Sequence, residues 1–504
     1  MGHPYGCPTR RAGLVRHPYA SHGDRRRVTV ESYDVVVLGA GTGGLGAARA
    51  VAAAGRTVAL VEPERPGGDC TWTGCVPSKT LLETARAARR ARRAGPRGVE
   101  ADVRADLPAA LAHARRVREE VYEDESPEVL ARQGVDLVTG RGRFTGPGQV
   151  EVGGRVLRGR RYVVATGARP RVPDVVGGVP HLTSETVWDL AEAPGHLLVL
   201  GGGPVGCELA QAFAALGVRV TLVQSGPRLL PRDEPAAGEV VAAVLRDDGV
   251  DLRLGARVVG VDPGPVLHLD DGARVAGTHL LVCTGRSPET AGLGLDAAGV
   301  AVGPDGRVLV DDRLRSRTNP HVWAVGDCAS PLAYTHVADD QARAAAGGLL
   351  LSLTRRPSRA ALPGRWRQDR VPWVTFTDPE VAHVGLTEAQ AHARWGAQAR
   401  VVTVPMSAVD RARCAGRTEG FLTLVAAPGP LGVAAAARVV GMTAVCPGAG
   451  ELVAAGALAV AARTTVARLA LTTAAYPTYG VALRVAAAAF VAPHGGVVAR
   501  PAAP

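Results

Sequence analysis

Tyr33-Asp-Val-Val-Val-Leu38 runs directly into Gly39-Ala-Gly41-Thr-Gly-Gly44, and an alanine-rich segment follows as far as Gly55. The apolar run predicts a buried parallel strand, and the alanine-rich segment predicts a helix. Glycines between a strand and a helix allow a tight turn, close backbone approach to a pyrophosphate and close helix packing. The residues predicted to line this nucleotide site are Gly39, Gly41, Thr42, Gly43 and Gly44.

A second strand and an acidic residue complete this pattern. Residues 57–61 are Thr-Val-Ala-Leu-Val, and Glu62 follows 23 residues after Gly39. An acid at this distance is expected to bind the ribose of a dinucleotide. A glycine motif alone is a weak signal in a chain with 63 glycines, but the ordered strand, turn, helix, strand and acid are specific.

The same pattern recurs further along the chain. Leu197-Leu-Val-Leu200 leads into a second glycine-rich turn, a predicted helix and the apolar strand of residues 218–223. Both copies also close with an apolar strand followed by Thr-Gly, at Thr166-Gly167 and at Thr284-Gly285. The halves therefore look like a duplication that binds two dinucleotides. The residues predicted to line the second site are Gly201, Gly203, Pro204, Val205, Gly206, Gln224 and Gly285.

Gln224 occupies the position that matches Glu62 in the first copy. A carboxylate at this position would repel a 2′-phosphate, so the neutral side chain permits NADPH. Ser225 follows, and Arg228 is the nearest cation. Both NADPH and NADH stay open, with a slight preference for NADPH.

Two cysteines lie between the first copy and a predicted helical insertion of residues 81–133. The segment reads Gly67-Gly68-Asp-Cys70-Thr-Trp-Thr-Gly-Cys75-Val-Pro-Ser-Lys79. Cysteines five apart that open a helix can close a small disulfide ring, and a helix N-terminus favours the thiolate. The alternative is a pair of buried cysteines that only pack against apolar neighbours. Lys79 is the single lysine among 58 Lys and Arg residues, which favours a chemical role for this segment.

The pattern Gly-Gly-x-Cys-x4-Cys-Val-Pro-Ser-Lys resembles the signature of the class I FAD-dependent pyridine nucleotide-disulfide oxidoreductases. Trp323-Ala-Val-Gly326-Asp327 resembles the second FAD motif of this family, and residues 372–385 resemble the start of its dimerisation domain. The resemblance implies FAD in the first site, NADPH or NADH in the second, and a homodimer. It also implies FAD contacts from Gly68, Lys79, Thr166, Gly167, Gly326, Asp327 and Thr335.

The resemblance further implies a catalytic role for residues of the redox segment. Cys75 would be the thiol beside the flavin, and Cys70 would be the thiol that meets the acceptor. Lys79 would lie near the flavin and pair with Glu208, which follows the second glycine turn.

The chain departs from the family pattern near its C-terminal end. Disulfide-reducing members carry His-Pro-Thr-x-x-Glu, whereas this chain has Tyr476-Pro-Thr-Tyr-Gly-Val481. A phenol with a pKa near 10 is a poor proton shuttle at pH 7. Mercuric reductases resemble this chain in placing tyrosine there, although residues 494–504 contain no vicinal cysteines. Tyr476 is therefore included among the candidate catalytic residues.

These observations favour a flavoprotein that oxidises NAD(P)H and reduces a small acceptor through Cys70 and Cys75, as mercuric reductases do. A dihydrolipoamide dehydrogenase-like disulfide oxidoreductase is the first alternative. A redox-sensing flavoprotein with little turnover is an alternative of a different class.

Composition excludes several other classes of protein. Of the 504 residues, 46% are hydrophobic and 21% are charged, which is typical of a globular chain. The net charge of +11 comes from scattered arginines, which disfavours nucleic-acid binding. No apolar run is long enough to span a membrane. Eight dispersed cysteines predict the reducing cytoplasm, and their spacing predicts no metal site.

The expected fold class is α/β, with two Rossmann-like dinucleotide-binding domains and a C-terminal α+β dimerisation domain. The predicted divisions are a disordered basic extension (1–31), an FAD-binding domain in two parts (32–174 and 292–364), an NAD(P)-binding domain (175–291) and the dimerisation domain (365–504).

Overall fold

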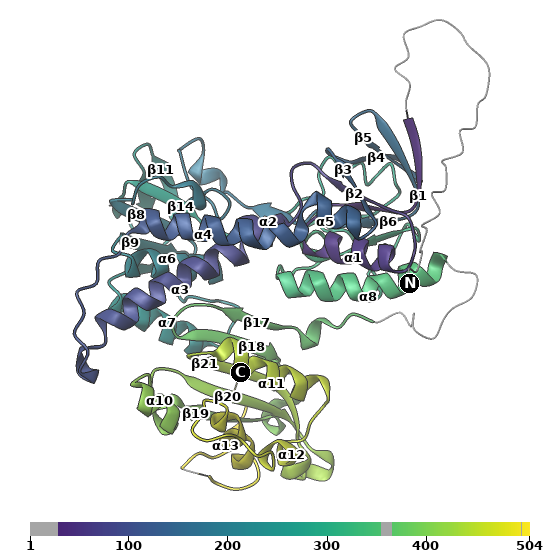
Figure 1. Cartoon of the computed structure of the whole chain (residues 1–504). Coiled ribbons are helices and arrows are strands. Elements are labelled where there is room, and N and C mark those ends of the chain that lie inside the picture. The colour runs from purple at the N-terminus through teal and green to yellow at the C-terminus, as the bar shows by residue number, and fades with distance from the viewer. Residues whose placement is uncertain (1–28, 354–364, 495, 504) are drawn as a thin grey trace, which may run out of the picture.

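The computed structural model describes residues 29–353, 365–494 and 496–503. Three units surround the centre of the molecule, and a long helical arm lies across two of them (Figure 1). Each unit is built on its own β-sheet, and the sheets come from separate stretches of the chain.

The first unit contains a seven-stranded sheet with the order β3-β2-β1-β6-β5-β4, in which β16 also pairs with β6. Strands β1, β2, β3, β6 and β16 pair in parallel, whereas β4 and β5 extend the sheet in antiparallel fashion. Val35 and Val37 are fully buried because helices α1 and α8 cover one face of the sheet, and Val36 is fully buried on the opposite face. The bounds are β1 Thr29–Leu38, β2 Val58–Glu62, β3 Val135–Thr139, β4 Arg143–Gly146, β5 Gln149–Val152, β6 Arg155–Val164, β16 Val322–Ala324, α1 Thr42–Ala53 and α8 Thr335–Leu353.

Strand β1 begins earlier than the sequence predicts. Thr29 to Glu31, which the sequence places in a disordered extension, pair with residues 155–157 of β6. Residues 1–28 of that extension lie outside the described residues.

The insertion between β2 and β3 is helical, and it forms the arm seen in Figure 1. Helix α3 packs against α4 and continues across to α6 of the second unit. The arm therefore carries residues from the first unit to the second. The bounds are α2 Gly68–Trp72, α3 Cys75–Arg92, α4 Leu107–Tyr122 and α5 Pro127–Arg132.

The second unit repeats the strand, turn and helix arrangement of the first. Its four parallel strands have the order β10-β9-β8-β14, and a three-stranded antiparallel sheet (β11, β12, β13) lies beside them. The short antiparallel pair β7 and β15 joins the two units. The bounds are β7 Ala168–Pro170, β8 His196–Leu200, β9 Arg219–Gln224, β10 Asp251–Leu254, β11 Val258–Asp262, β12 Val266–Leu269, β13 Arg274–Ala276, β14 His279–Val282, β15 Arg286–Pro288, α6 Pro204–Ala215 and α7 Pro235–Asp247.

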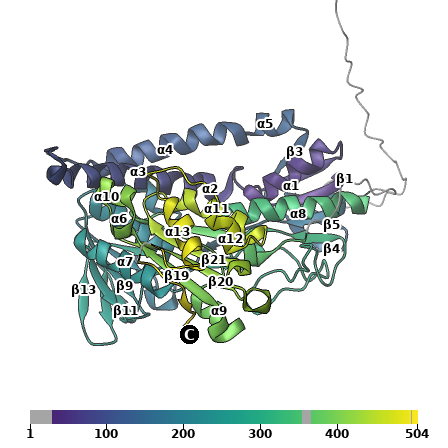
Figure 2. The same ribbon diagram turned by 90° about the horizontal axis from the view of Figure 1, so that it is seen from below.

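The C-terminal unit contains a six-stranded antiparallel sheet with the order β17-β18-β21-β20-β19-β22. The view from below in Figure 2 shows its helices in front of this sheet. The bounds are β17 Pro372–Thr375, β18 Glu380–Gly385, β19 Arg400–Pro405, β20 Phe421–Ala427, β21 Arg438–Cys446, β22 Arg500–Pro501, α9 Glu388–Trp395, α10 Asp410–Ala415, α11 Ala449–Ala461, α12 Val466–Ala470 and α13 Val481–Ala489.

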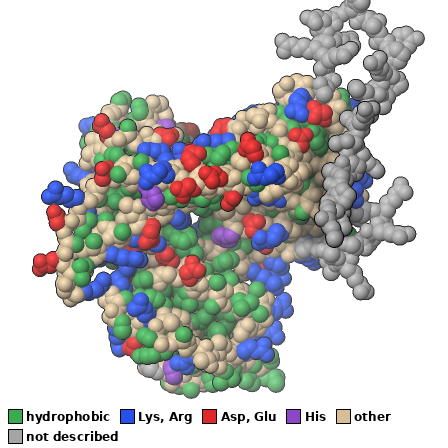
Figure 3. Space-filling view, in the orientation of Figure 1, with side chains coloured by type: hydrophobic (Ala, Val, Ile, Leu, Met, Phe, Trp, Pro, Cys, Tyr) green, Lys and Arg blue, Asp and Glu red, His purple; other side chains and the backbone are tan. Residues whose placement is uncertain are grey.

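Apolar side chains gather on the surface of the C-terminal unit, at the bottom of the view in Figure 3. Leu431, Leu458 and Leu471 are among the large apolar side chains of this unit that are exposed. Over the stretches that the structure describes, no helix combines the length and apolar character that a membrane crossing requires.

Candidate active site

The two cysteines of the redox segment lie on either side of a glycine turn. Cys70 belongs to the short helix α2, and Cys75 is the first residue of α3 after the cap residue Gly74. A Cβ on Gly68 would lie 2.6 Å from the Cα of Gly41, so only glycine allows this segment to approach the first glycine turn. The redox segment and the first nucleotide turn therefore form one site. Both cysteines are free thiols in the structure.

The two thiols differ in their acidity. A hydrogen bond between the sulfurs is the largest effect, and it lowers the pKa of Cys75 while raising the pKa of Cys70. Burial raises the pKa of both thiols. The Thr335 hydroxyl, 3.1 Å from the Cys75 Sγ, and the Lys79 ammonium lower the pKa of Cys75 further, against a smaller opposing effect of Glu208. Cys75 is therefore the thiol that ionises first, and Cys70 retains its proton.

Lys79 lies one turn along α3 from Cys75 and pairs with Glu208, the contact that the resemblance implies. The Lys79 Nζ lies 2.9 Å from Oε2 of Glu208, whose side chain is 6% exposed. The second oxygen, Oε1, accepts a hydrogen bond of 2.8 Å from the backbone N–H of Phe376. The Lys79 Nζ also lies 4.5 Å from the centre of the Phe376 ring. The C-terminal unit thus contributes directly to this ion pair.

The first glycine turn has the geometry of a phosphate cradle. Gly39 has φ +97°, and a Cβ on Gly44 would collide with the carbonyl oxygen of Gly39. Glu62 at the end of β2 accepts a hydrogen bond of 2.8 Å from the N–H of Ala40. Burial raises the pKa of Glu62, although two backbone N–H groups oppose this effect. The turn opens onto the N-terminus of α1, where the helix dipole favours an anion.

A partly buried guanidinium contacts the redox segment and the second FAD motif. Arg286 of β15 contacts Asp69 and the carbonyl oxygen of Ala168, and its Nε lies 3.7 Å from Asp327 Oδ2. The buried Nε atom has no hydrogen-bond partner. Burial raises the pKa of Asp327, whereas Arg286 lowers it. An unpartnered donor and glycine turns that exclude a Cβ fit a bound pyrophosphate, so the residues present fit FAD.

The remaining predicted FAD contacts are distributed around this cradle. Thr166 and Gly167 follow β6, and the Thr166 hydroxyl donates to the carbonyl oxygen of Glu289. The N–H of Gly326 donates to Gln341 of α8, which holds the second motif against the helix. Thr42 begins α1, and a Cβ on the next residue, Gly43, would lie 3.1 Å from the Val325 side chain of that motif.

The second glycine turn reproduces the first one closely. Gly201 has φ +115°, and a Cβ on Gly206 would collide with the carbonyl oxygen of Gly201. The Gln224 Oε1 accepts a hydrogen bond of 2.9 Å from the N–H of Gly202, as Glu62 does for Ala40. The other predicted contacts lie around this turn: Gly203 caps α6, Pro204 and the exposed Val205 begin it, and Gly285 follows β14.

Tyr476 lies on the surface of the C-terminal unit, where its side chain is 71% exposed. Its hydroxyl donates a hydrogen bond of 2.9 Å to Oδ2 of Asp410, and this contact raises the pKa of the phenol. Val481 and both of these residues line a cavity of about 180 Å³. Residues 476–481 lack the histidine and the glutamate that the family carries at these positions. The structure instead places the carboxylate of Asp410 beside Tyr476, a contact that the motif does not indicate. A separation of 66 residues gives no sequence signal for such a contact.

The other described cysteines differ in exposure. Cys414 is exposed on α10, and Cys283 lies just after β14 and is partly buried. Cys207, Cys328 and Cys446 are buried, as packing residues are. Within the described part of the chain, no cluster of three or more His, Cys, Asp or Glu side chains could hold a metal ion.

Comparisons with known proteins agree with this geometry. Residues 33–342 match the family model described as pyridine nucleotide-disulphide oxidoreductase, and residues 371–487 match the dimerisation domain of that family. A mercuric reductase of Streptomyces lividans is 36% identical over 474 residues, which cover 91% of this chain and 96% of the relative. A dihydrolipoyl dehydrogenase of Thermus scotoductus is 34% identical over 475 residues, covering 91% and 98% of the two chains.

A solved structure shows the same fold over nearly the whole chain. LpdA from Mycobacterium tuberculosis has a TM-score of 0.79 and 29% sequence identity, and the match covers 92% of this chain and 99% of LpdA. The two Rossmann-like units are thus the FAD- and NAD(P)-binding parts of the fold, and the third unit is the dimerisation domain. The chain belongs to the pyridine nucleotide-disulphide oxidoreductase family, whose members use FAD and NAD(P)H.

Proposed function

We propose that the protein reduces a small thiophilic acceptor with electrons from NAD(P)H, and that Cys70 and Cys75 are the residues that carry out the exchange. The observation that supports this proposal most directly is the placement of the two cysteines around one glycine turn, with the Thr335 hydroxyl 3.1 Å from the Cys75 sulfur and the Lys79–Glu208 pair one turn along α3. In this proposal Cys75, the thiol that ionises readily, exchanges electrons with the flavin, and Cys70, the thiol that keeps its proton, contacts the acceptor.

Each residue of the site has a defined task in this proposal. The Thr335 hydroxyl and the Lys79 ammonium hold Cys75 as a thiolate, and Glu208 holds Lys79 in place. Cys70 attacks or binds the acceptor after its proton leaves. The turn at Gly39 to Gly44, with Glu62, Arg286 and Asp327, holds FAD. When bound, FAD supplies the two-electron chemistry that links a nicotinamide hydride to the two sulfurs.

We propose a thiophilic metal ion such as Hg(II), presented as a thiolate complex, as the acceptor. A hydride and a proton together supply two electrons and two protons, so NAD(P)H and one proton convert a Hg(II) bis-thiolate into metallic mercury and two thiols. This acceptor leaves as an atom that needs no proton, so an imidazole acid is not required at position 476. The Tyr476 hydroxyl donates its proton to Asp410, so the lone pairs of its oxygen are available to the metal ion.

The proposal is tested by measuring NADPH and NADH oxidation by the purified enzyme with Hg(II) in excess thiol, lipoamide, glutathione disulfide and a quinone. The expected result is turnover with Hg(II) that Cys70→Ser abolishes while bound FAD is still reduced by NADPH. Cys414→Ser removes the exposed thiol of α10, which lies near Tyr476, and unchanged turnover in this variant would show that Cys414 is not the thiol that Hg(II) reduction requires. Hg(II)-dependent oxidation that survives in Cys70→Ser would contradict the proposal, and reduction of FAD without turnover of any acceptor would favour a redox sensor.

A dihydrolipoamide dehydrogenase-like activity is the second candidate. Its support is the dihydrolipoyl dehydrogenase relative, which is 34% identical over almost the entire length of both chains. Lipoamide turnover comparable to the Hg(II) rate would favour this candidate.

We also propose that the protein is a homodimer and that Tyr476 faces the Cys70 of the second copy. The exposed apolar side chains of the dimerisation domain and the exposed Tyr476 support this arrangement. We also propose the domain boundaries that the sequence predicts, which follow residues 174, 291 and 364. Light scattering at micromolar concentration tests the assembly, and a monomer would contradict it.

A further inference from the structure

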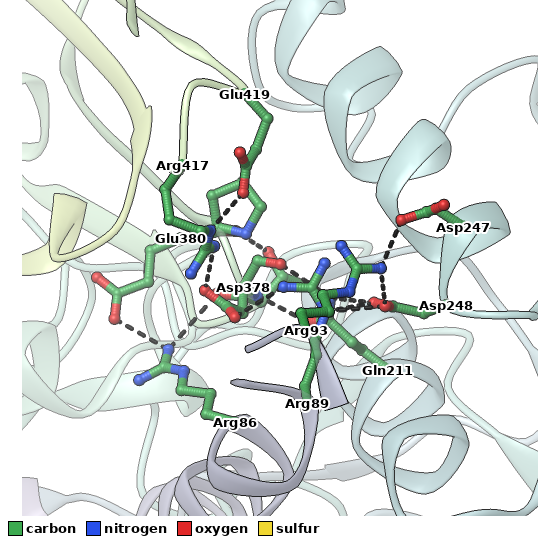
Figure 4. A network of polar contacts seen from close by, with 12 residues as sticks. Arg86, Arg89, Arg93, Gln211, Asp247, Asp248, Asp378, Glu380, Arg417 and Glu419 are labelled. Atoms are coloured by element: carbon green, nitrogen blue, oxygen red, sulfur yellow. Dashed lines mark hydrogen bonds and ion pairs between the residues drawn. The ribbon is translucent and has the colours of Figure 1, made fainter. Parts of the chain in front are cut away.

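A buried group of charged and polar side chains joins all three units (Figure 4). We call it the clamp, and its members are Arg89 of α3, Gln211 of α6, Asp248 after α7, Asp378 after β17, and Arg417 before β20. Arg89, Gln211 and Asp378 are each no more than 5% exposed.

The charges within the clamp balance one another. Arg89 donates to Asp248 and, at 2.8 Å, to Oδ2 of Asp378, whose other oxygen accepts a bond of 2.6 Å from Arg417. Burial alone would raise the pKa of Asp378, but the two guanidinium groups lower it below its usual range. Asp378 is therefore a buried carboxylate held by two cations, and its position is closely defined.

The same segment of the dimerisation domain contacts α6 through its backbone. We call residues 376–378 the docking turn. The N–H of Asp378 donates to the Gln211 Oε1 at 2.7 Å, and the Gln211 Nε2 donates to the carbonyl oxygen of Asp378 at 3.1 Å. Two residues earlier, the N–H of Phe376 donates to Glu208 at 2.8 Å. Because Glu208 and Gln211 lie three residues apart on α6, they present neighbouring attachment points to the docking turn.

We propose that Asp378 and Gln211 are positioning residues for the Lys79–Glu208 pair. They fix the docking turn on α6, so that the Phe376 N–H orients Glu208 and the Phe376 ring lies against Lys79. This inference rests on the proposed function, because it concerns how the Lys79 ammonium is held near the Cys75 sulfur.

The clamp can influence Cys75 through position without any change in charge. Gln211 is neutral, and it holds the docking turn three residues from Glu208 on α6. The groups that face the Cys75 sulfur are Cys70, Thr335, Lys79 and Glu208. Gln211→Met can therefore change the acidity of Cys75 only by moving the ion pair, whereas Asp378→Asn also removes a buried charge.

The test compares Asp378→Asn and Gln211→Met with Arg93→Gln in the holoenzyme. Arg93, the residue after α3, donates to Asp247 and Asp248 but not to Asp378, so its substitution removes a neighbouring guanidinium and leaves the docking turn attached. Gln211→Met changes no charge, which keeps the comparison valid if Asp378→Asn does not fold. Hydrogen–deuterium exchange of the Phe376 amide reports the docking turn, and the pH titration of the long-wavelength absorbance of a thiolate beside oxidised flavin reports Cys75.

The expected result is faster exchange at Phe376 in Asp378→Asn and Gln211→Met, together with a titration midpoint raised by about half a pH unit or more. Arg93→Gln should match the wild type in both measurements. An unchanged titration in a variant whose Phe376 amide exchanges faster would overturn the inference, as would unchanged exchange in both variants. Absence of the long-wavelength band in the wild type would instead count against the proposed function, and the exchange data would still decide whether the clamp holds the docking turn.

Discussion

Replacing Thr335 by valine isolates one interaction of the Cys75 thiolate. Valine has nearly the same shape as threonine, so Thr335→Val removes the hydroxyl that lies 3.1 Å from the sulfur and little else. When Cys75 is ionised the hydroxyl must be the donor, and a hydrogen bond to a charged group contributes about 1.5–3 kcal/mol. Since about 1.36 kcal/mol corresponds to one pKa unit, the pKa of Cys75 should rise by about 1–2 units.

The sign of the effect is observable in the enzyme reduced by two electrons. The thiolate of Cys75 disappears as the pH falls through its pKa, so the long-wavelength absorbance of Thr335→Val should be lost at a pH about 1–2 units higher than in the wild type. Thr80→Val is the matched control, because the Thr80 hydroxyl donates to the carbonyl oxygen of Val76 on the same helix and does not contact the sulfur. Coincident titrations of Thr335→Val and the wild type would refute the assignment of Thr335 as a donor to the thiolate.

Three further predictions concern the cofactor turns and Tyr476. Tyr476→His should raise lipoamide turnover by about 10²-fold, the lower end of the roughly 10²- to 10⁴-fold range of general acid–base catalysis, because Asp410 is placed to orient an imidazole. Adding Asp410→Asn should remove most of this gain in a steady-state assay. Gln224→Glu should raise the ratio of kcat/KM with NADH to kcat/KM with NADPH by about tenfold or more, since a carboxylate repels a 2′-phosphate. The same ratio in the variant and the wild type would contradict this expectation. Glu62→Gln should leave the melting temperature of the apoprotein unchanged while weakening FAD binding by about tenfold in a fluorescence titration. A lowered melting temperature of the apoprotein would show instead that the fold needs the charge.

The fold could be predicted from sequence because its decisive features are local. Each glycine turn requires backbone conformations and close approaches that a side chain would prevent, and Gly44 and Gly206 record this requirement in the sequence. The parallel strands around these turns are continuous apolar runs, which periodicity identifies directly. The start of β1 escapes prediction because Thr29 to Glu31 are not an apolar run, and pairing with β6 holds them.

The parts of the site that the sequence did not reveal depend on contacts between distant segments. Phe376 approaches Glu208 from 168 residues away, and Arg286 of β15 contacts Asp69 of the redox segment across 217 residues. In both cases the sequence does not indicate which distant residue the backbone N–H or the guanidinium contacts. Such contacts follow from how the units pack, which local patterns do not encode.

The two nucleotide turns separate the structural task of a side chain from its chemical task. Glu62 and Gln224 both accept a hydrogen bond from the second N–H of their glycine turn, at 2.8 and 2.9 Å. An amide oxygen and a carboxylate oxygen serve this purpose equally well, so the turn itself does not require a charge. We therefore expect the cofactor to select the charge, with the Glu62 carboxylate suited to the ribose hydroxyls of FAD and the neutral Gln224 amide compatible with either nicotinamide dinucleotide. In the sequence, Gln224 looks like the loss of a binding residue. In the structure, Gln224 still holds the glycine turn, and what it lacks is the charge that would discriminate between the dinucleotides.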